Sequence, residues 1–178
     1  MFAASLLLAA CATPSAPQPL PYRFSMGAFT DERSSEELAL PQTFPFSQAM
    51  FFNQLRKVMP YSIFGSAEAA LDVAMTHYEA TRYGDSYAVS MVMEMRGRDA
   101  YARGLLKKPF MCSAVAHRGF ELDDYAQQVW TDKNLTALTP AAREEKMWHQ
   151  VFSTCVRDLA DQFGSALVAA QTAKGAIR

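Results

Sequence analysis

Residues 71–96 constrain the fold most, because their apolar side chains recur at every second position over two successive runs. A period of two is typical of β-strands that bury one face, so the runs predict strands over 71–81 and 86–96. Between them, Gly84 can supply the positive φ that a tight turn requires, which predicts an antiparallel hairpin. The core-facing side chains are expected to be Leu71, Val73, Met75, Tyr87, Val89, Met91, Met93 and Met95.

A long helix is predicted near the C-terminus, where apolar residues recur at intervals of three and four. Thr139 is a favourable N-cap residue and Pro140 suits the first helical position, so we expect the helix to begin there. Residues 168–178 are expected to form a fraying tail. The apolar stripe, which should lie on the sheet, consists of Met147, Trp148, Val151, Phe152, Cys155, Leu159, Phe163 and Leu167.

Weaker patterns fill the N-terminal half of the chain. Apolar and polar residues alternate over 21–29 and predict a first strand, which is followed by the charged residues 30–37 as a solvated loop. Ser47 is the expected N-cap of a helix that Pro60 ends, and residues 61–65 are expected to add a short edge strand. The apolar stripe of this helix consists of Met50, Phe51, Phe52, Leu55 and Val58.

The chain after the hairpin is less regular. Residues 97–99 are expected to turn the chain into a third strand over 100–116, with an interruption near Pro109, which has no N–H to donate. Residues 121–130 are expected to form a helical turn or two. The resulting order is a strand, a helix, a meander of about three strands and a long helix.

This order predicts the fold class α+β. The strands form a mainly antiparallel sheet of about four strands, and two helices cover one face of it. The result is a two-layer sandwich in which the C-terminal helix is the longest. A single globular domain over 21–178 is expected, because the chain of 178 residues is long enough to bury one core.

The N-terminus carries the most specific motif of the chain. The tetrad from Leu8 to Cys11 (LAAC) follows further leucines, and small residues before a cysteine resemble a bacterial lipobox. Residues 1–10 are therefore expected to be a signal peptide, truncated because no Lys or Arg precedes its leucines. Cys11 would become the lipidated N-terminus. Two alternatives stay open, namely an apolar N-terminus that packs on the fold and a signal that is cut elsewhere.

Residues 11–20 are expected to be the lipidated cysteine and a tether. Four of the ten residues from Ala12 to Pro21 are proline, which fixes φ and cannot donate a backbone hydrogen bond. The segment is therefore expected to be an extended, solvated spacer with a reach of roughly 30 Å. Such a spacer would hold a domain away from a membrane surface.

Composition excludes several classes of protein. A net charge of −1 gives no electrostatic basis for binding nucleic acid. No stretch approaches the ~20 apolar residues that a membrane-spanning helix needs. Besides Cys11, the chain has only Cys112 and Cys155. A disulfide between them and two separate buried thiols are both open interpretations.

We find no constellation that indicates catalysis, a cofactor or a metal site. The sequence has no GxSxG nucleophile turn, no HExxH and no P-loop. The histidines are scattered: His77 is expected on the core face of its strand, His149 near Glu144 and Glu145 on a helix surface, and His117 apart from both. The expectation is a protein that is not an enzyme and binds no cofactor.

The abundance of methionine on the hairpin is unusual. Met75, Met91, Met93 and Met95 are all expected on the inward face. The simpler interpretation is a core beneath two helices. The alternative is an adaptable apolar groove for a lipid or small ligand, because methionine fills irregular sites. Full burial of these side chains would exclude the groove.

The chain resembles small bacterial outer-membrane lipoproteins. The features that carry the resemblance are the lipobox, the proline spacer, the strand with its charged loop, the hairpin and the terminal helix. The similarity is to the ABC-transport auxiliary lipoproteins and, more distantly, to the lipopolysaccharide-assembly lipoprotein. It covers most of the chain, but only the lipobox is a specific motif. Residues 118–140 depart from the compact pattern of these proteins.

The resemblance implies a role and a location. Ala12, rather than Asp, after the lipidated cysteine implies the outer membrane, with the domain facing the periplasm. The implied role is a non-enzymatic subunit of an envelope transport or assembly complex, whose partners are the membrane, through the anchor, and an envelope protein. The strand over 21–29, if it lies at a sheet edge, and the loop over 30–37 are the expected contact elements.

Overall fold

The computed structural model describes residues 23–59, 68–117 and 140–175. Its centre is the predicted hairpin, in which β2 (Ala69–Tyr83) and β3 (Ser86–Asp99) pair antiparallel around Gly84, whose φ is 58°. The predictions for residues 1–22, 61–65 and 121–130 fall outside the described residues.

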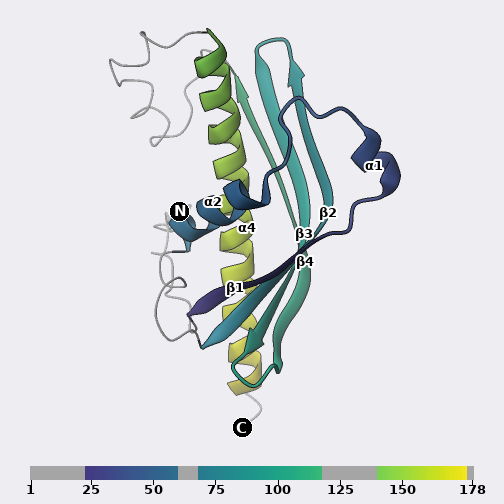
Figure 1. The fold of residues 1–178 in the computed structure, drawn as a ribbon. Coiled ribbons are helices and arrows are strands. Elements are labelled where there is room, and N and C mark those ends of the chain that lie inside the picture. Colours follow the sequence, from purple (N-terminus) through teal and green to yellow (C-terminus); the bar gives the residue numbers. More distant parts are fainter. Residues whose placement is uncertain (1–22, 60–67, 118–139, 176–178) are drawn as a thin grey trace, which may run out of the picture.

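Two further strands complete a sheet of order β1-β2-β3-β4 (Figure 1). β4 (Gly104–His117) pairs antiparallel with β3, and β1 (Phe24–Asp31) pairs parallel with β2. The predicted sandwich with a mainly antiparallel sheet is confirmed, because only the β1–β2 pair is parallel. β1 and β4 are the two edge strands.

The turn between β3 and β4 lies later than predicted. β3 continues through Gly97 to Asp99, and the turn closes where the Asp99 carboxylate accepts the backbone N–H groups of Tyr101 and Arg103. Gly97 stays in the strand because the Phe24 ring packs against it, 3.3 Å from where a Cβ would lie. A glycine in a strand can mark such a close approach rather than a turn.

Pro109 does not interrupt β4, contrary to the prediction. It pairs with Glu94 of β3 within a continuous ladder. Phe110 pairs with Met93, and alternate residues of an edge strand direct their backbone groups away from the sheet. The proline is tolerated because its missing N–H lies on the free edge.

Two helices differ from the predictions. The loop predicted over 30–37 contains α1 (Ser35–Ala39), whose N-terminus is closed by a reciprocal capping box between Ser34 and Glu37. α4 (Pro140–Gly175) includes most of the segment that we expected to fray. It continues because residues 168–174 contain no Gly or Pro that would end the helix.

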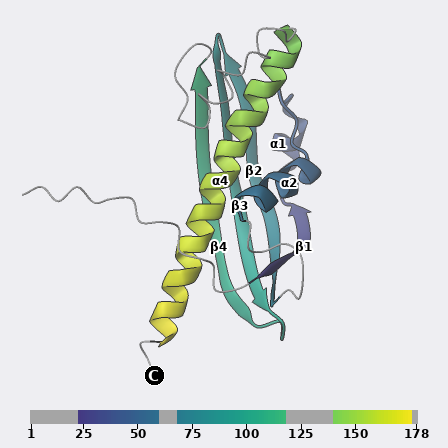
Figure 2. The ribbon, with the colours of Figure 1, turned by 90° about the vertical axis from the view of Figure 1, so that its left-hand side faces the viewer.

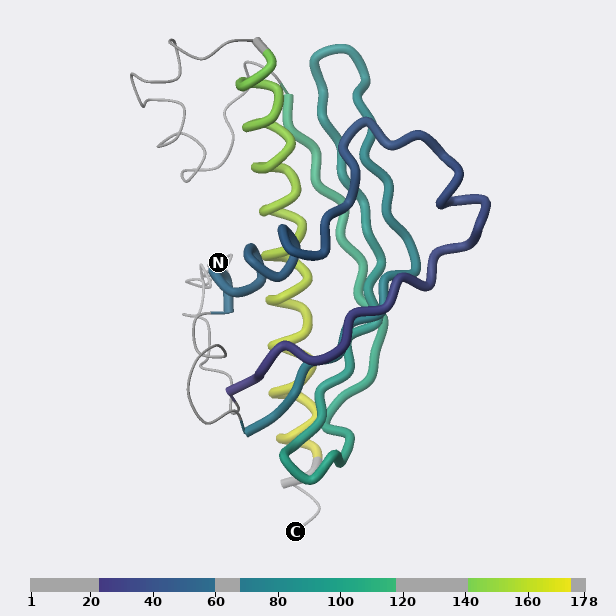
Figure 3. The backbone as a smooth tube through the Cα atoms, in the orientation of Figure 1, coloured from purple at the N-terminus to yellow at the C-terminus, as the bar shows by residue number. Residues whose placement is uncertain are grey.

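α2 (Gln48–Val58) begins after Ser47 as predicted, and the Ser47 hydroxyl accepts the Met50 N–H. α2 and α4 lie on one face of the sheet, whereas α1 lies on the opposite side (Figures 1 and 2). Figure 3 shows how the chain between β1 and α2 passes around the β2 side of the sheet. There the Gln42 side chain accepts the Ala80 N–H. β1 cannot accept it, because its pairing with β2 ends at Met75.

The core lies between the sheet and α4. Every predicted core-facing residue of the hairpin is buried, as is the whole predicted stripe of α4. Aromatic rings fill the space around α2, where Phe46 contacts Phe51, Tyr78 and Phe152. None of the described helices is long and apolar enough to span a membrane.

Candidate functional site

The sheet face opposite α4 carries a cluster of three polar side chains, Glu37, His77 and Ser90. It is created by an irregularity in β2, where the register with β3 shifts between Met75 and His77. The extra residue turns His77 away from the core. The prediction that His77 lies on the core face is therefore wrong, because a β-bulge breaks the alternation that the prediction assumed.

The cluster joins three elements in line. His77 Nδ1 lies 2.6 Å from Oε1 of Glu37 in α1, and its Nε2 lies 3.3 Å from the Ser90 hydroxyl in β3. Glu37 also accepts the Ser34 N–H at 3.2 Å. The hydrogen bond with His77, followed by that with the Ser34 N–H, lowers the pKa of Glu37. Glu37 is therefore an ionised acceptor at neutral pH.

The order carboxylate, imidazole, hydroxyl is also that of a hydrolytic triad, but the backbone does not suit one. Ser90 lies in the middle of β3, which pairs with β2 on one side and β4 on the other. The backbone N–H groups around Ser90 donate to the neighbouring strands. They therefore form no oxyanion hole, which a hydrolase needs to stabilise its transition state. The geometry instead supports a structural role, in which the contact between Glu37 and His77 holds α1 against the sheet.

A second set of contacts holds the segment between β1 and α1. The Arg33 guanidinium donates to both oxygens of Asp31 and lies 6.0 Å from the centre of the Tyr78 ring. This ion pair lowers the pKa of Asp31, chiefly through the side-chain hydrogen bond from Arg33. The Glu32 N–H continues the ladder to the Met75 carbonyl. These contacts fix the segment that leads from β1 to α1, the two expected contact elements.

Exposed apolar side chains accompany these polar contacts. Leu38 and Leu40 of the α1 segment are exposed, and Met111 and Val115 are exposed on β4. The two β4 residues pair with Val92 and Ala88, whose neighbours in the strand face the core, so they lie on the face opposite α4. Sequence reasoning missed this surface, although strict alternation around Cys112 could have identified Met111 as outward-facing.

The remaining histidines do not join the cluster. His117 Nδ1 lies 2.5 Å from the Ser86 hydroxyl at the other end of β4, and His149 lies 3.7 Å from Glu145 on α4. The pairing of His149 with Glu145 agrees with the predicted helix surface. Among the described residues, no group of three or more His, Cys, Asp or Glu side chains could hold a metal ion.

Cys112 and Cys155 form a disulfide, which resolves the two interpretations that the sequence left open. The bond joins β4 to α4 inside the core, with the Cα atoms 5.4 Å apart.

The alternative of an apolar groove at the hairpin methionines is wrong. All four side chains are fully buried beneath the helices: Met75, Met91, Met93 and Met95.

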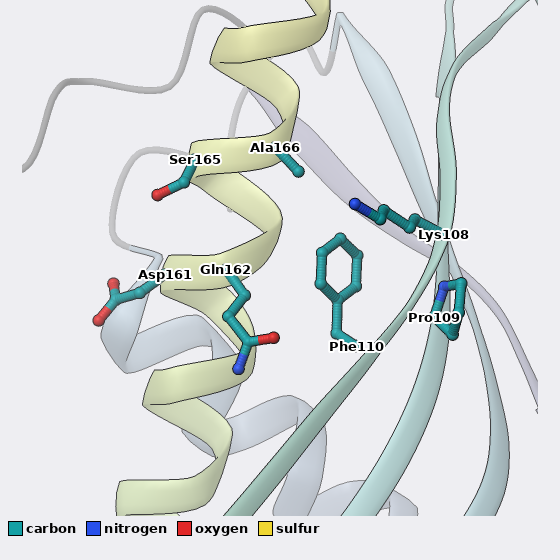
Figure 4. Close-up of a pocket in the computed structure, with 7 residues that line it drawn as sticks. All are labelled: Lys108, Pro109, Phe110, Asp161, Gln162, Ser165 and Ala166. Carbon is teal, nitrogen blue, oxygen red and sulfur yellow. The ribbon is translucent and has the colours of Figure 1, made fainter.

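A shallow groove of about 480 Å³ lies between α4 and the edge strand β4 (Figure 4). In it, Gln162 donates to the Met111 carbonyl at 2.8 Å, which satisfies one backbone acceptor of the free edge. The lining mixes charges with one aromatic ring, and we assign it no ligand. The lining residues are Lys108, Pro109, Phe110, Asp161, Gln162, Ser165 and Ala166.

Comparison with known proteins shows a likeness of fold. No protein-family model matches the sequence, and no curated protein sequence matches it at a significant level. A candidate lipoprotein from Caulobacter crescentus superimposes with a TM-score of 0.50 at 12% identity, covering 81% of this chain and 91% of the other. The chain therefore shares its fold with that protein, and the identity is too low to transfer a function.

Two other solved structures are more distant. An uncharacterized lipoprotein B from Nitrosomonas europaea gives a TM-score of 0.41 at 12% identity, covering 85% of this chain and 88% of its own. A minor lipoprotein from Acinetobacter baumannii gives 0.38 at 12% identity, with 86% and 96% covered. The predicted lipobox around Cys11 lies outside the described residues.

Proposed function

We propose that this chain is a lipoprotein anchored through Cys11 in the outer membrane and facing the periplasm. In this proposal it acts as a non-enzymatic subunit of an envelope transport or assembly complex. The observation that carries the proposal is the order of its N-terminal segments. A lipobox ends at Cys11, a proline-rich spacer follows, and β1 begins at Phe24.

Physical chemistry supports anchoring as the main task of this arrangement. Two or more acyl chains on one residue give stable membrane attachment, whereas a single chain binds reversibly. A proline-rich spacer is expected to be extended, so the anchored domain could reach a neighbouring protein while it stays attached. The two-layer fold shared with the Caulobacter crescentus protein is compatible with a role as a binding module.

The geometry supports contact with a protein partner through β1 and α1. β1 is an edge strand, and an edge offers unpaired backbone groups to an added strand. The α1 segment that follows β1 in the chain presents the exposed side chains Leu38 and Leu40. The Glu37–His77 contact holds α1 in place against the sheet, so these leucines are presented on a fixed support.

Replacement of Cys11 tests the anchor. Cys11→Ala is expected to move the protein from the membrane fraction to the soluble periplasmic fraction and to abolish incorporation of labelled palmitate. The matched control is Ala12→Ser, which leaves the cysteine in place and should stay membrane-bound. Unchanged membrane association of Cys11→Ala would contradict the anchor. Separation of inner from outer membranes tests the outer-membrane location.

Site-specific crosslinking tests the partner. A photoreactive residue at Leu38 is expected to capture an envelope protein in intact cells, whereas the same residue at Tyr83, which is also exposed, should capture less. Leu38→Asp should then reduce co-purification of the captured protein without lowering the amount of folded chain. Failure of both positions to capture any envelope protein would count against a role as a subunit.

A further inference from the structure

We infer that the end of the domain nearest the tether docks on an anionic phospholipid surface, with Tyr101 at the contact. The inference rests on the proposed anchor at Cys11 and adds an orientation to it. It follows from three observations, namely where the chain enters the fold, where one tyrosine is exposed, and how the charges of that end are buried.

The tether enters the domain at one end of the sheet. Phe24, the first residue of β1, pairs with Ala69, and Ala69 pairs with Asp99 at the end of β3. The turn between β3 and β4 therefore lies at the end where β1 begins, as Figure 1 shows at the lower end of the sheet. We call this the tether end, defined by Arg23, Phe24, Ala69 and residues 98–108.

Length favours this end as the one that meets the membrane. Residues 11–22 in a polyproline II conformation would reach about 37 Å. The 14 residues of β3 span roughly 43 Å from the tether end to the opposite hairpin. If the opposite hairpin stood on the membrane, the point of attachment would be lifted by about the length of β3, which the tether could span only when fully stretched.

Tyr101 marks the tip of the tether end. It is 80% exposed, the largest value among the exposed large hydrophobic residues. The Arg103 guanidinium lies 5.2 Å from the centre of its ring, and the Asp99 carboxylate fixes the turn by accepting the Tyr101 N–H. Tyrosine is enriched at membrane interfaces, where its ring meets the lipid and its hydroxyl meets water.

At the tether end, the basic side chains are more exposed than the acidic side chains with which they pair. The side chains of Arg98, Arg103 and Lys107 are 44%, 74% and 63% exposed. Their acidic partners are much less accessible, with Asp72 at 19%, Asp99 at 12% and Glu94 at 24%.

Further exposed charges at this end are Arg23 and Lys108, against Glu68. The cationic groups are therefore on the outside and the acids lie beneath them. Such a surface attracts anionic headgroups, and the attraction falls off within a Debye length.

The opposite end provides a matched contrast. Its hairpin also presents a tyrosine, Tyr83, which is 68% exposed. Its charges are mixed, because Arg82 pairs with Glu144 at equal exposure of 36% and Asp85 lies in the turn. An exposed tyrosine is thus common to both ends, whereas, among the described residues, buried acids beneath exposed cations are found at the tether end.

Vesicle binding of an unlipidated chain tests the inference independently of the anchor. In a Cys11→Ser background, the full chain is mixed with vesicles of phosphatidylglycerol and phosphatidylethanolamine, or of phosphatidylcholine alone, at low ionic strength. Binding is expected only to the anionic vesicles and should weaken as salt is added. Every variant shares this background, so any contribution of residues 1–10 is the same in all.

Substitutions locate the contact. Lys107→Gln and Lys108→Gln are each expected to lower the partition coefficient roughly fivefold, and Tyr101→Ser should lower it further. The controls at the opposite end, Tyr83→Ser and Lys146→Gln, should leave it unchanged. Circular dichroism melting checks that each variant is folded.

The outcomes separate this inference from the proposed function. Equal binding to both vesicle types, equal losses at both ends, or no binding at all would overturn the membrane contact and leave the anchor unaffected. In the last case the tether end would be assigned to a protein partner. A Cys11→Ala protein that stays in the membrane fraction would instead contradict the anchor, whatever the vesicles show.

Discussion

At the scale of single residues, Asp72 is the side chain on which the edge of the sheet depends. The register between β1 and β2 shifts between Met26 and Phe29, which leaves the Ala28 N–H without a ladder partner. Asp72 accepts that N–H at 2.9 Å, and its two oxygens also contact Nε and Nη2 of Arg98. One carboxylate therefore completes a parallel edge strand and joins it to β3.

Gly27 leaves the space that Asp72 occupies. A Cβ at this position would lie 2.2 Å from the Asp72 Oδ1 atom and 3.1 Å from the Leu71 carbonyl oxygen. We expect Gly27→Ala to lower the free energy of unfolding by about 1–3 kcal/mol, because the carboxylate must move from its donors. Urea denaturation measures this. Gly104→Ala is the control, since its Cβ would meet nothing within 4 Å, and equal midpoints for the two variants would contradict the account.

Asp72 also predicts a pH dependence of stability. The hydrogen bond from Arg98, followed by that from the Ala28 N–H, lowers the pKa of Asp72 below its ordinary value of 3.8. A carboxyl group whose pKa is lowered by folding stabilises the protein above pH 3.8, and this stabilisation is lost as the pH falls through the folded value.

The stability difference between the wild type and Asp72→Asn should therefore be constant above about pH 5 and decrease below pH 4. Denaturation at a series of pH values measures it. A difference that stays constant down to pH 2.5 would show that the carboxylate charge is not involved.

At the scale of elements, the disulfide is the strongest constraint between the sheet and α4. It closes a loop with a sequence separation of 43. The chain-entropy model gives about 4 kcal/mol for a loop of that length, through restriction of the unfolded chain. The Cys112→Ala, Cys155→Ala double variant is therefore expected to unfold at a clearly lower urea concentration. Reductant should destabilise the wild type and leave the double variant unchanged; no effect on the wild type would contradict a structural bond.

The elements also show what a sequence can and cannot predict. The hairpin and the stripe of α4 were predictable because each buries one face over many residues, and the periodicity is averaged over all of them. α1 was not predictable from periodicity, because it buries no residue, although the spacing of Ser34 and Glu37 fits a capping box.

The bulge before His77 was not predictable. It arises from a one-residue mismatch between β2 and β3. Such a mismatch depends on how two strands pair, so the sequence of one strand does not reveal it. The Glu37–His77–Ser90 cluster, which brings together residues up to 53 positions apart (Ser90 and Glu37), therefore appears only in the folded chain.

At the scale of the whole molecule, one face of the sheet is buried and the other is exposed. Rings, methionines and the disulfide fill the face beneath α4, whereas the other face carries the Glu37–His77–Ser90 cluster and exposed apolar side chains. A surface that is apolar, exposed and supported by a rigid sheet is suited to binding another molecule. The anchor and the tether end would then decide which way that surface faces.

A matched pair of methionines tests this division. Met91 and Met111 lie on adjacent strands, where Met91 pairs with Cys112 and Val92 pairs with Met111, but Met91 is fully buried and Met111 is 68% exposed. Met91→Ala is expected to lower the free energy of unfolding by about 2–5 kcal/mol, because it leaves a cavity beneath α4. Met111→Ala should cost less than about 0.5 kcal/mol.

Urea denaturation of the two variants measures the difference, and its dependence on protein concentration adds a second readout. If Met111→Ala costs as much as Met91→Ala at every concentration, the outer face is covered within the folded chain and is not a binding surface. If the cost grows with concentration, the cover is a second copy of the chain, since only association depends on protomer concentration. A small cost at all concentrations would mean that the face is exposed in the folded chain and free to bind another molecule.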